Sequence, residues 1–232
     1  MAIIEIKDLV KVYNTTQVPV NAVNGITLNF EEGEFTAIVG PSGSGKTTFL
    51  NLLGGLDDPT NGTILISNQE INHLSSNQRI KFRLNHIGFI FQAYNLIPVL
   101  TAKENIEFIM ELQKRPKKER NERSKELLKA VGIEDKADVF PRQLSGGQQQ
   151  RVAVARALAS HPQYILADEP TANLDSTSTE NLLNIMEKLN REEKITFIFS
   201  THDARVVKKA RRVITIEDGK VVSDERRNDH EF

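Results

Sequence analysis

The sequence contains no cysteine, so it can form neither a disulfide nor a thiolate metal site, and a reducing compartment suits it. It also has no uncharged apolar run of about 18 residues, the length expected of a membrane-spanning helix. The opening residues alternate apolar and charged side chains, unlike a secretory leader. If the protein acts at a membrane, we therefore expect another subunit to hold it there.

An excess of charge of either sign is also missing. The 30 Lys and Arg residues and 31 Asp and Glu residues leave a net charge of −1, which argues against direct electrostatic capture of nucleic acid. Apolar residues make up 39% of the 232 residues and charged residues 26%, which is typical of a folded globular chain. This length is enough for one sizeable domain with its own core.

Strand and helix patterns alternate along most of the chain. Strands are predicted over residues 4–10, 20–30 and 34–39, and a helix after residue 47 ends at Gly54 and Gly55. In the middle, Thr101 and Glu104 form a capping box that opens one helix. Pro116 ends that helix, and a second, strongly charged helix runs to Val131.

The last third repeats the alternation. Here the patterns predict a helix ending at Pro162, a strand over 164–167, a helix through 182–189, a strand over 195–199 and a hairpin of 212–217 with 220–222. We expect the polar residues from 224 onward to be frayed. Such alternation is typical of an α/β fold with a mainly parallel sheet and helices on both faces.

A glycine-rich loop at residues 40–47 reads GPSGSGKT and matches the phosphate-loop pattern GxxxxGK[ST]. Its glycines let successive N–H groups point at phosphate oxygens, and the following helix adds its positive end. The alternative, a glycine-rich turn, is disfavoured because a strand precedes the loop and an amphipathic helix follows it. The nucleotide-binding residues predicted here are Gly40, Ser42, Gly43, Ser44, Gly45, Lys46 and Thr47, the last also as a ligand of Mg²⁺.

Two carboxylates, Asp168 and Glu169, follow an apolar strand at its carboxyl end, where ligands bind in open α/β sheets. Asp168 suits a second contact to Mg²⁺, and Glu169 is placed to polarise an attacking water. A polar strand end leading into a turn is the alternative. The presence of a phosphate loop in the same chain argues against that alternative.

A second glycine pair occurs in the stretch Leu144–Gln148, which precedes a helix that Ser145 can cap. The pair allows close approach of the backbone, and the helix N-terminus favours an anion. Because residues 40–47 already supply one phosphate site, this second phosphate-binding element suggests a second molecule. The alternative is that the two glycines simply form the start of a helix and bind nothing.

The stretch LSGGQ resembles the signature motif of ABC ATPases, and the other elements of that family follow in order. Residues 40–47 match its Walker A loop, and Asp168 with Glu169 match the end of its Walker B strand. Further matches are Gln92 to the Q-loop glutamine, Ala172–Asp175 to the D-loop, His202 to the switch histidine and Tyr13 to the aromatic residue against adenine. Taken singly, Gln92 is equally a loop glutamine, His202 a helix-capping residue and Tyr13 a packing residue.

The resemblance implies a P-loop NTPase core with a mainly parallel sheet, an N-terminal antiparallel β-subdomain and a helical insert. One cassette would span 1–232, with the core and β-subdomain over about 1–92 and 142–222 and the helical subdomain over about 93–141. It also implies ATP hydrolysis coupled to transport, with ATP and Mg²⁺ as cofactors.

The resemblance further implies a head-to-tail dimer of cassettes that encloses ATP. Lys46, Thr47 and Thr48 would bind phosphates and metal, Gln92 would sense the metal, Glu169 would be the base and His202 would hold the γ-phosphate. Across the interface, ATP would meet Ser145, Gly146, Gly147, Gln148 and Asp175.

The segments around Gln92–Leu112 and Gln143–Arg151 resemble the lipoprotein-releasing, macrolide-export and FtsE-like subfamily, although Ala172 departs from the glycine common there. An integral membrane permease would hold the cassette at the cytoplasmic face of the inner membrane, docking near exposed apolar residues such as Tyr94, Leu96, Ile97 and Val99. The same residues could instead pack the helical insert. The alternatives are the ATPase subunit of another system, such as an amino-acid importer, and a soluble non-transport ATPase.

Overall fold

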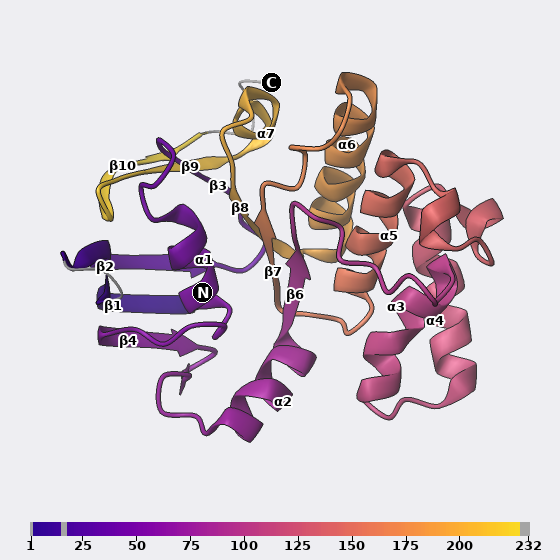
Figure 1. The fold of residues 1–232 in the computed structure, drawn as a ribbon, viewed down its shortest axis with the longest axis horizontal. Coiled ribbons are helices and arrows are strands. Elements are labelled where there is room, and N and C mark those ends of the chain that lie inside the picture. The colour runs from indigo at the N-terminus through magenta and orange to yellow at the C-terminus, as the bar shows by residue number, and fades with distance from the viewer. Residues whose placement is uncertain (1, 15–17, 228–232) are drawn as a thin grey trace.

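The computed structural model describes residues 2–14 and 18–227, and within them the strands form two sheets (Figure 1). The smaller sheet is antiparallel and has the order β2-β1-β4-β5. Its strands are β1 (Ala2–Tyr13), β2 (Val20–Glu31), β4 (Asn61–Ile66) and β5 (Gln69–Glu70). The expected N-terminal antiparallel sheet is therefore present.

The larger sheet has the order β10-β9-β3-β8-β7-β6. Its neighbouring strands are parallel except at the β9–β10 hairpin, as expected of an α/β fold. The strands are β3 (Phe35–Val39), β6 (Ile87–Ile90), β7 (Tyr164–Asp168), β8 (Thr196–Ser200), β9 (Arg212–Glu217) and β10 (Lys220–Arg226).

Each face of the larger sheet is buried in a separate apolar cluster, because successive side chains on a strand point to opposite faces. On β8, Phe197 and Phe199 pack with helices α5 and α6, while Ile198 between them packs with α1 and the antiparallel sheet. The near-continuous apolar runs of these strands follow from burial on both faces.

Helices cover both faces and form a separate lobe at the right of Figure 1, where α3 and α4 lie. Thr101 caps α3 and Ser145 caps α5, each through a complete capping box, which confirms both predicted helix starts. The α-helices are α1 (Lys46–Leu53), α2 (Ser76–His86), α3 (Ala102–Leu112), α4 (Lys117–Ala130), α5 (Gly146–Leu158), α6 (Ser176–Glu193) and α7 (Ala204–Lys209).

The structure corrects three expectations. Helix α5 ends at Leu158 rather than running to Pro162, and His161 in the connection adopts a positive φ of 53°. Strand β10 extends to Arg226 instead of fraying from residue 224, because Asp224 forms a two-bond ion pair with Arg212 on β9. Helices α2 and α7 were not predicted. Within the described ranges, no helix is long and apolar enough to cross a membrane.

Candidate functional site

The phosphate loop connects β3 to α1, and Gly40, Gly43 and Gly45 all have positive φ, which side-chain-bearing residues rarely adopt. A Cβ on Gly45 would lie 2.0 Å from the carbonyl oxygen of Ala22. The Nζ of Lys46 donates hydrogen bonds to the carbonyl oxygens of Gly40 and Pro41, each 2.8 Å long. The loop thus curls around its own lysine, and most of its residues line a cleft.

The cleft beside this loop has a volume of about 660 Å³ and gathers most of the predicted site residues. Ser44 is buried behind the loop, and its Oγ finds no hydrogen-bond partner among the described residues. The predicted residues that line the cleft are Tyr13, Gly40, Ser42, Gly43, Gly45, Lys46, Thr47, Thr48, Gln92, Glu169 and His202.

Asp168 lies at the carboxyl end of β7, next to the phosphate loop. Both of its carboxylate oxygens are 3.1 Å from the Oγ1 of Thr47, which donates to them. Burial raises the pKa of Asp168, and hydrogen bonds from Ser200 and Thr47 oppose that rise. A nearby cation would offset the cost of burying this negative charge.

One hydroxyl and one carboxylate are suitable ligands for Mg²⁺, which often binds through one or two carboxylates and completes its shell with substrate phosphates and water. No group of three His, Cys, Asp or Glu side chains suited to a metal occurs in the described part of the chain. Thr47 and Asp168 therefore fit an ion that arrives with a nucleotide.

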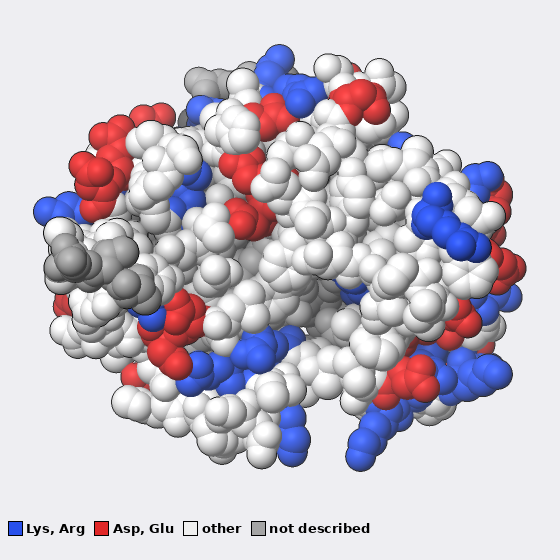
Figure 2. Space-filling view, viewed as in Figure 1, with Lys and Arg blue, Asp and Glu red and all other residues white. Residues whose placement is uncertain are grey.

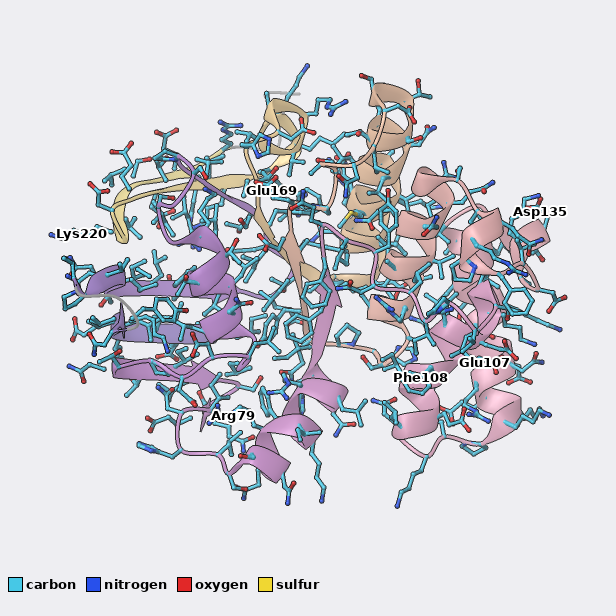
Figure 3. The ribbon with its side chains drawn as sticks, in the orientation of Figure 1. Arg79, Glu107, Phe108, Asp135, Glu169 and Lys220 are labelled. Carbon is cyan, nitrogen blue, oxygen red and sulfur yellow. The ribbon has the colours of Figure 1, made fainter. Side chains whose placement is uncertain are left out.

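Glu169 has a left-handed backbone with φ of 46°, and its N–H donates to the carbonyl of Ser200, 2.9 Å away. The two neighbouring carboxylates have different partners, because Asp168 contacts Thr47 while Glu169 contacts the loop after β8. The Oε1 of Glu169 lies 2.7 Å from Nδ1 of His202, and its Oε2 accepts a 3.3 Å hydrogen bond from Thr201. Figure 3 shows Glu169 in the upper part of the molecule, below α7.

Tyr13 lines the cleft while its hydroxyl donates to Asp57 over 2.6 Å and its ring lies 4.9 Å from the Nζ of Lys11. The side chain is therefore held by the β-subdomain and also faces the loop. A packing role for Tyr13 and a role against adenine are compatible, because the contacts that hold the side chain leave it lining the cleft.

The signature residues lie outside this cleft. Ser145 caps α5 by accepting a hydrogen bond from the N–H of Gln148, and Gly146 and Gly147 form the first turn. Asp175 is also outside the cleft, where its side chain caps α6 by accepting from Ser178. This chain therefore does not bring its own signature or Asp175 to its own phosphate loop.

The segment after Gln92 is tied to both ends of α5. At the N-terminal end, a Cβ on Gly146 would lie 2.8 Å from the hydroxyl of Tyr94, so glycine leaves room for this tyrosine. Towards the C-terminal end, Arg156 donates to the carbonyl oxygens of Tyr94 and Asn95, at 2.9 and 2.5 Å. The Nδ2 of Asn173 donates to the carbonyl of Gln92 over 3.0 Å, which links this segment to the loop before α6.

A second, mainly apolar groove of about 650 Å³ lies between α2, α3 and α5. Of the apolar residues expected to be exposed here, Val99 is 76% exposed, but Leu96 packs against the core, Ile97 lines the groove and Tyr94 is half-buried over Gly146. Three of the four side chains thus fold back on the helices, as the packing alternative predicted, and Val99 alone of the four is exposed.

Sequence patterns missed several residues at the cleft. Val20, Ala22 and Ser200 also line it, although none belongs to a motif. Asp203, next to His202, accepts a 2.9 Å hydrogen bond from Thr171, which joins the loops that follow β7 and β8. Of these residues, only Ser200 had a sequence signal for a place at the cleft, since it stands at the carboxyl end of a predicted strand.

Comparisons with known proteins agree with this geometry. The family model described as ABC transporter matches residues 23–172. An uncharacterised ABC transporter ATP-binding protein of Thermotoga maritima is 46% identical over 97% of this chain and 96% of its own length. The macrolide export ATP-binding/permease protein MacB of Hyphomonas neptunium is 47% identical, and the match covers 96% of this chain but 34% of that protein.

Solved structures give the same result for the fold. The dimeric cassette MJ0796, a protein of Methanocaldococcus jannaschii, has a TM-score of 0.90 and 44% identity over 97% of this chain and 99% of that chain. A second dimeric structure of MJ0796, in a post-hydrolysis state bound to ADP and Pi, has a TM-score of 0.89. The chain belongs to the ABC transporter family, as an ATP-binding cassette with the ATPase fold.

Proposed function

We propose that the chain binds ATP in the cleft and hydrolyses it as the motor of an ABC transporter. The N–H groups of the loop, with Lys46, Thr47 and Thr48, would hold the phosphates, and Tyr13 would face the adenine. Thr47, Asp168 and Gln92 would hold Mg²⁺, which neutralises charge on the phosphates when bound. The support is that the cleft gathers cationic, hydroxyl and carboxylate groups beside the loop.

Glu169 is the proposed general base. Glu169 contacts His202 and Asp168 contacts Thr47, which would leave one carboxylate for the attacking water and one for the metal. His202 would hold the γ-phosphate and the attacking water in register, and Gln92 would sense the metal and report to the partner subunit.

The observation that carries the dimer proposal is the absence of the signature from this chain's own cleft. The residues Ser145, Gly146, Gly147, Gln148 and Asp175 would act on ATP held by a second cassette, in a head-to-tail homodimer or heterodimer. ATP would then close the dimer and its hydrolysis would open it. The dimeric structure of the cassette MJ0796 supports this arrangement.

Mixing two defective chains tests the arrangement. Lys46→Ala damages the phosphate loop, and Ser145→Arg damages the signature. Both sites of either homodimer then contain one damaged element, so neither homodimer has a complete site. A mixed dimer contains one site built from the intact loop of one chain and the intact signature of the other. We expect steady-state ATP hydrolysis to return on mixing. Mixtures that stay inactive, while each variant remains folded, would show that the signature does not act across a dimer.

The membrane partner is proposed to be a permease of the lipoprotein-releasing, macrolide-export or FtsE-like type, with the cassette peripheral at the cytoplasmic face of the membrane. The support is the match to MacB, which carries ATP-binding and permease functions in one protein. The helical subdomain, about residues 93–141, would provide much of the docking groove.

Purification of the chain from its native membrane in mild detergent tests this assignment. Co-purification with a permease that has four transmembrane helices and a large outer domain is expected. An importer-type permease, or no membrane protein at all, would instead favour the importer or the soluble alternative.

A further inference from the structure

Glu169 has a backbone conformation that its side chain and its neighbour both disfavour. Its φ of 46° lies in the left-handed region, which residues with a side chain rarely adopt. Pro170 follows it, and proline favours an extended backbone in the residue before it. These two residues open the turn 169–172, which comes directly after β7. Strained backbone of this kind persists only where the surrounding structure holds it in place.

The turn is held by backbone bonds and by one side chain. The N–H of Glu169 donates to the carbonyl of Ser200 over 2.9 Å, and the N–H of Ala172 donates to the carbonyl of Glu169 over 3.2 Å. The further bond comes from α5, where the Nε2 of Gln150 donates to the carbonyl of Pro170 over 2.6 Å. Among the described residues, no other side chain forms a hydrogen bond with the main chain of this turn.

Gln150 is fully buried, and the bond to Pro170 is the one hydrogen bond that its side chain forms with the described residues. Its Oε1 has no partner there. A buried polar atom without a partner destabilises a fold, whereas an apolar side chain of similar size would leave no polar atom unpaired. Packing therefore does not account for an amide at this position. The bond to Pro170 is the contact that requires a donor.

The two other buried amide side chains of the described residues are bonded at both ends. The Nδ2 of Asn105 donates to three carbonyl oxygens, and its Oδ1 accepts from the N–H of Ile97. Asn190 likewise donates to three carbonyl oxygens and accepts from Arg211. These amides join several segments of the fold. Gln150 instead forms a single bond, which ends on the residue next to Glu169.

The turn reaches the surface, and Gln150 lies beneath it. Figure 2 shows acidic side chains in the upper middle of the view, the region in which Figure 3 labels Glu169. Glu169 lines the ATP cleft, whereas Gln150 is buried and does not line it. A nucleotide in the cleft can therefore contact Glu169 but not Gln150. Any effect of Gln150 on hydrolysis must pass through the turn.

Helix α5 also places Gln150 close to the signature. Gln150 lies about one helical turn after Gly146, and Ser145 caps the same end of the helix. The bond to Pro170 thus connects the first turns of α5 to the turn that carries Glu169. In the proposed dimer, the signature of one chain contacts ATP held by its partner, while Glu169 of that chain acts on the ATP in its own cleft.

We propose that Gln150 is a positioning residue for ATP hydrolysis. Its amide holds the carbonyl of Pro170, which fixes the strained turn that carries Glu169 and ties that turn to the helix of the signature. Gln150 thereby links the two ATP sites of a dimer within one chain. The inference rests on the proposed function and adds a residue that does not touch the nucleotide. Loss of the bond should therefore slow hydrolysis and leave nucleotide binding unchanged.

Gln150→Met tests the bond in ATP hydrolysis by the full chain. Methionine has a similar length and no donor, so it fills the site without bonding Pro170. Because misplacement of a reacting group by about 1 Å can cost about 10²-fold in rate, we expect kcat to fall by about ten- to hundredfold. The dissociation constant for a fluorescent ATP analogue should stay within about twofold of the parental value, since the phosphate loop is untouched.

Gln150→Glu makes the same bond depend on pH. Burial disfavours an ionised carboxyl and raises the pKa of fully buried glutamic acids to about 8–9. Below this pKa the carboxylic acid donates to the carbonyl of Pro170, as the amide does, and above it the carboxylate cannot donate. The ratio of its kcat to the parental kcat should be close to unity at about pH 6 and should fall by about pH 9.5. Measurement of the parent in the same buffers cancels the titration of Glu169 and His202.

Gln113→Met is the matched control. The Nε2 of Gln113, at the end of α3, donates to the carbonyl of Leu84 over 3.1 Å, so this variant removes an amide-to-carbonyl bond outside the ATP cleft. Its kcat should equal the parental value. Thermal unfolding checks that every variant is folded.

A parental kcat in Gln150→Met would overturn the proposal, as would an equal fall in Gln113→Met. A loss of ATP-analogue affinity as large as the loss of kcat would assign Gln150 to nucleotide binding instead. If Gln150→Glu is as slow as Gln150→Met at about pH 6, or if its ratio does not fall as the pH rises, donation to Pro170 does not set the rate. Failure of the proposed function differs from all of these, because the parent and Gln113→Met would then not hydrolyse ATP either.

Discussion

The Nδ1 atom of His202 lies 2.7 Å from the Oε1 atom of Glu169, although the two residues come from loops after different strands of the parallel sheet. The side chain of Glu169 is 18% exposed, while that of His202 is 76% exposed and open to the cleft. The pair therefore joins a shielded carboxylate to an accessible imidazole. A substrate phosphate can reach the imidazole without displacing the carboxylate.

Glu169→Gln should bind ATP and lose turnover. The amide has nearly the same shape but cannot accept the proton of the attacking water, so we expect phosphate release to fall by about 10²- to 10⁴-fold. Phosphate release and ATP-dependent dimerisation, measured by size-exclusion chromatography with light scattering, check this. The variant should accumulate as a closed dimer. Turnover at the parental rate would exclude Glu169 as the base.

Lys46→Ala should weaken nucleotide binding, because it removes the cation nearest the expected phosphates. A hydrogen bond to a charged group contributes about 1.5–3 kcal/mol, which corresponds to roughly ten- to hundredfold in affinity. Titration with a fluorescent ATP analogue measures the change, and Lys220→Ala, an exposed lysine on β10, is the control. Unchanged affinity would remove Lys46 from the phosphate site.

Gly45→Ala and Gly43→Ala separate two effects of a side chain in the phosphate loop. Both positions have positive φ, so each alanine costs about 1–2 kcal/mol of backbone strain. Only at Gly45 would the Cβ meet a backbone atom, the Ala22 carbonyl at 2.0 Å, whereas at Gly43 nothing lies within 4 Å. Urea denaturation should therefore show a larger loss of unfolding free energy for Gly45→Ala. Equal losses would contradict the clash.

Acid should weaken the β9–β10 hairpin through Asp224. The hydrogen bonds from Arg212 lower the pKa of Asp224, so its unfolded form binds a proton more readily than its folded form. The ion pair therefore contributes fully above the unfolded pKa, about 3.9, and its contribution is lost as the pH falls through the folded pKa. Asp224→Asn should cost about 1 kcal/mol at neutral pH.

The free energy of unfolding from urea titrations between neutral and acidic pH checks this, since Asp224→Asn should flatten the decline below about pH 4. Glu225→Gln, at the next and exposed position of β10, is the matched control. A decline in Asp224→Asn that matches the parent at every pH would contradict the assignment.

Local motifs explain what could be predicted from the sequence. The phosphate loop, the strand that ends at Asp168 and the capping boxes at Thr101 and Ser145 depend on neighbours within a few residues, so spacing alone identifies them. The parallel order of the larger sheet follows from the alternation of strands and helices. Predicting these features requires only the local spacing of residues and the pattern of apolar side chains, and no knowledge of contacts between distant parts of the chain.

Features that depend on distant contacts could not be predicted. The hydroxyl of Tyr94 lies over Gly146, and Arg156 bonds carbonyls about 60 residues earlier in the chain, so neither contact leaves a local pattern. Helix α2 has one buried residue, Phe82, and its apolar residues Ile80, Phe82 and Leu84 lack the spacing of a helix face, which explains why it was missed. The six residues of α7 are too few for a periodic signal.

The two carbonyl bonds of the Lys46 ammonium have a consequence for the energetics of nucleotide binding. An ammonium has three N–H donors, and the oxygens of Gly40 and Pro41 occupy two of them, so one donor remains for a phosphate group while the loop keeps both bonds. A phosphate that takes a second donor must displace one of these carbonyl oxygens, and the gain from that contact is offset by the bond released within the loop. The loop therefore holds the ammonium in place before the nucleotide binds, and the first phosphate contact requires no bond of the loop to break.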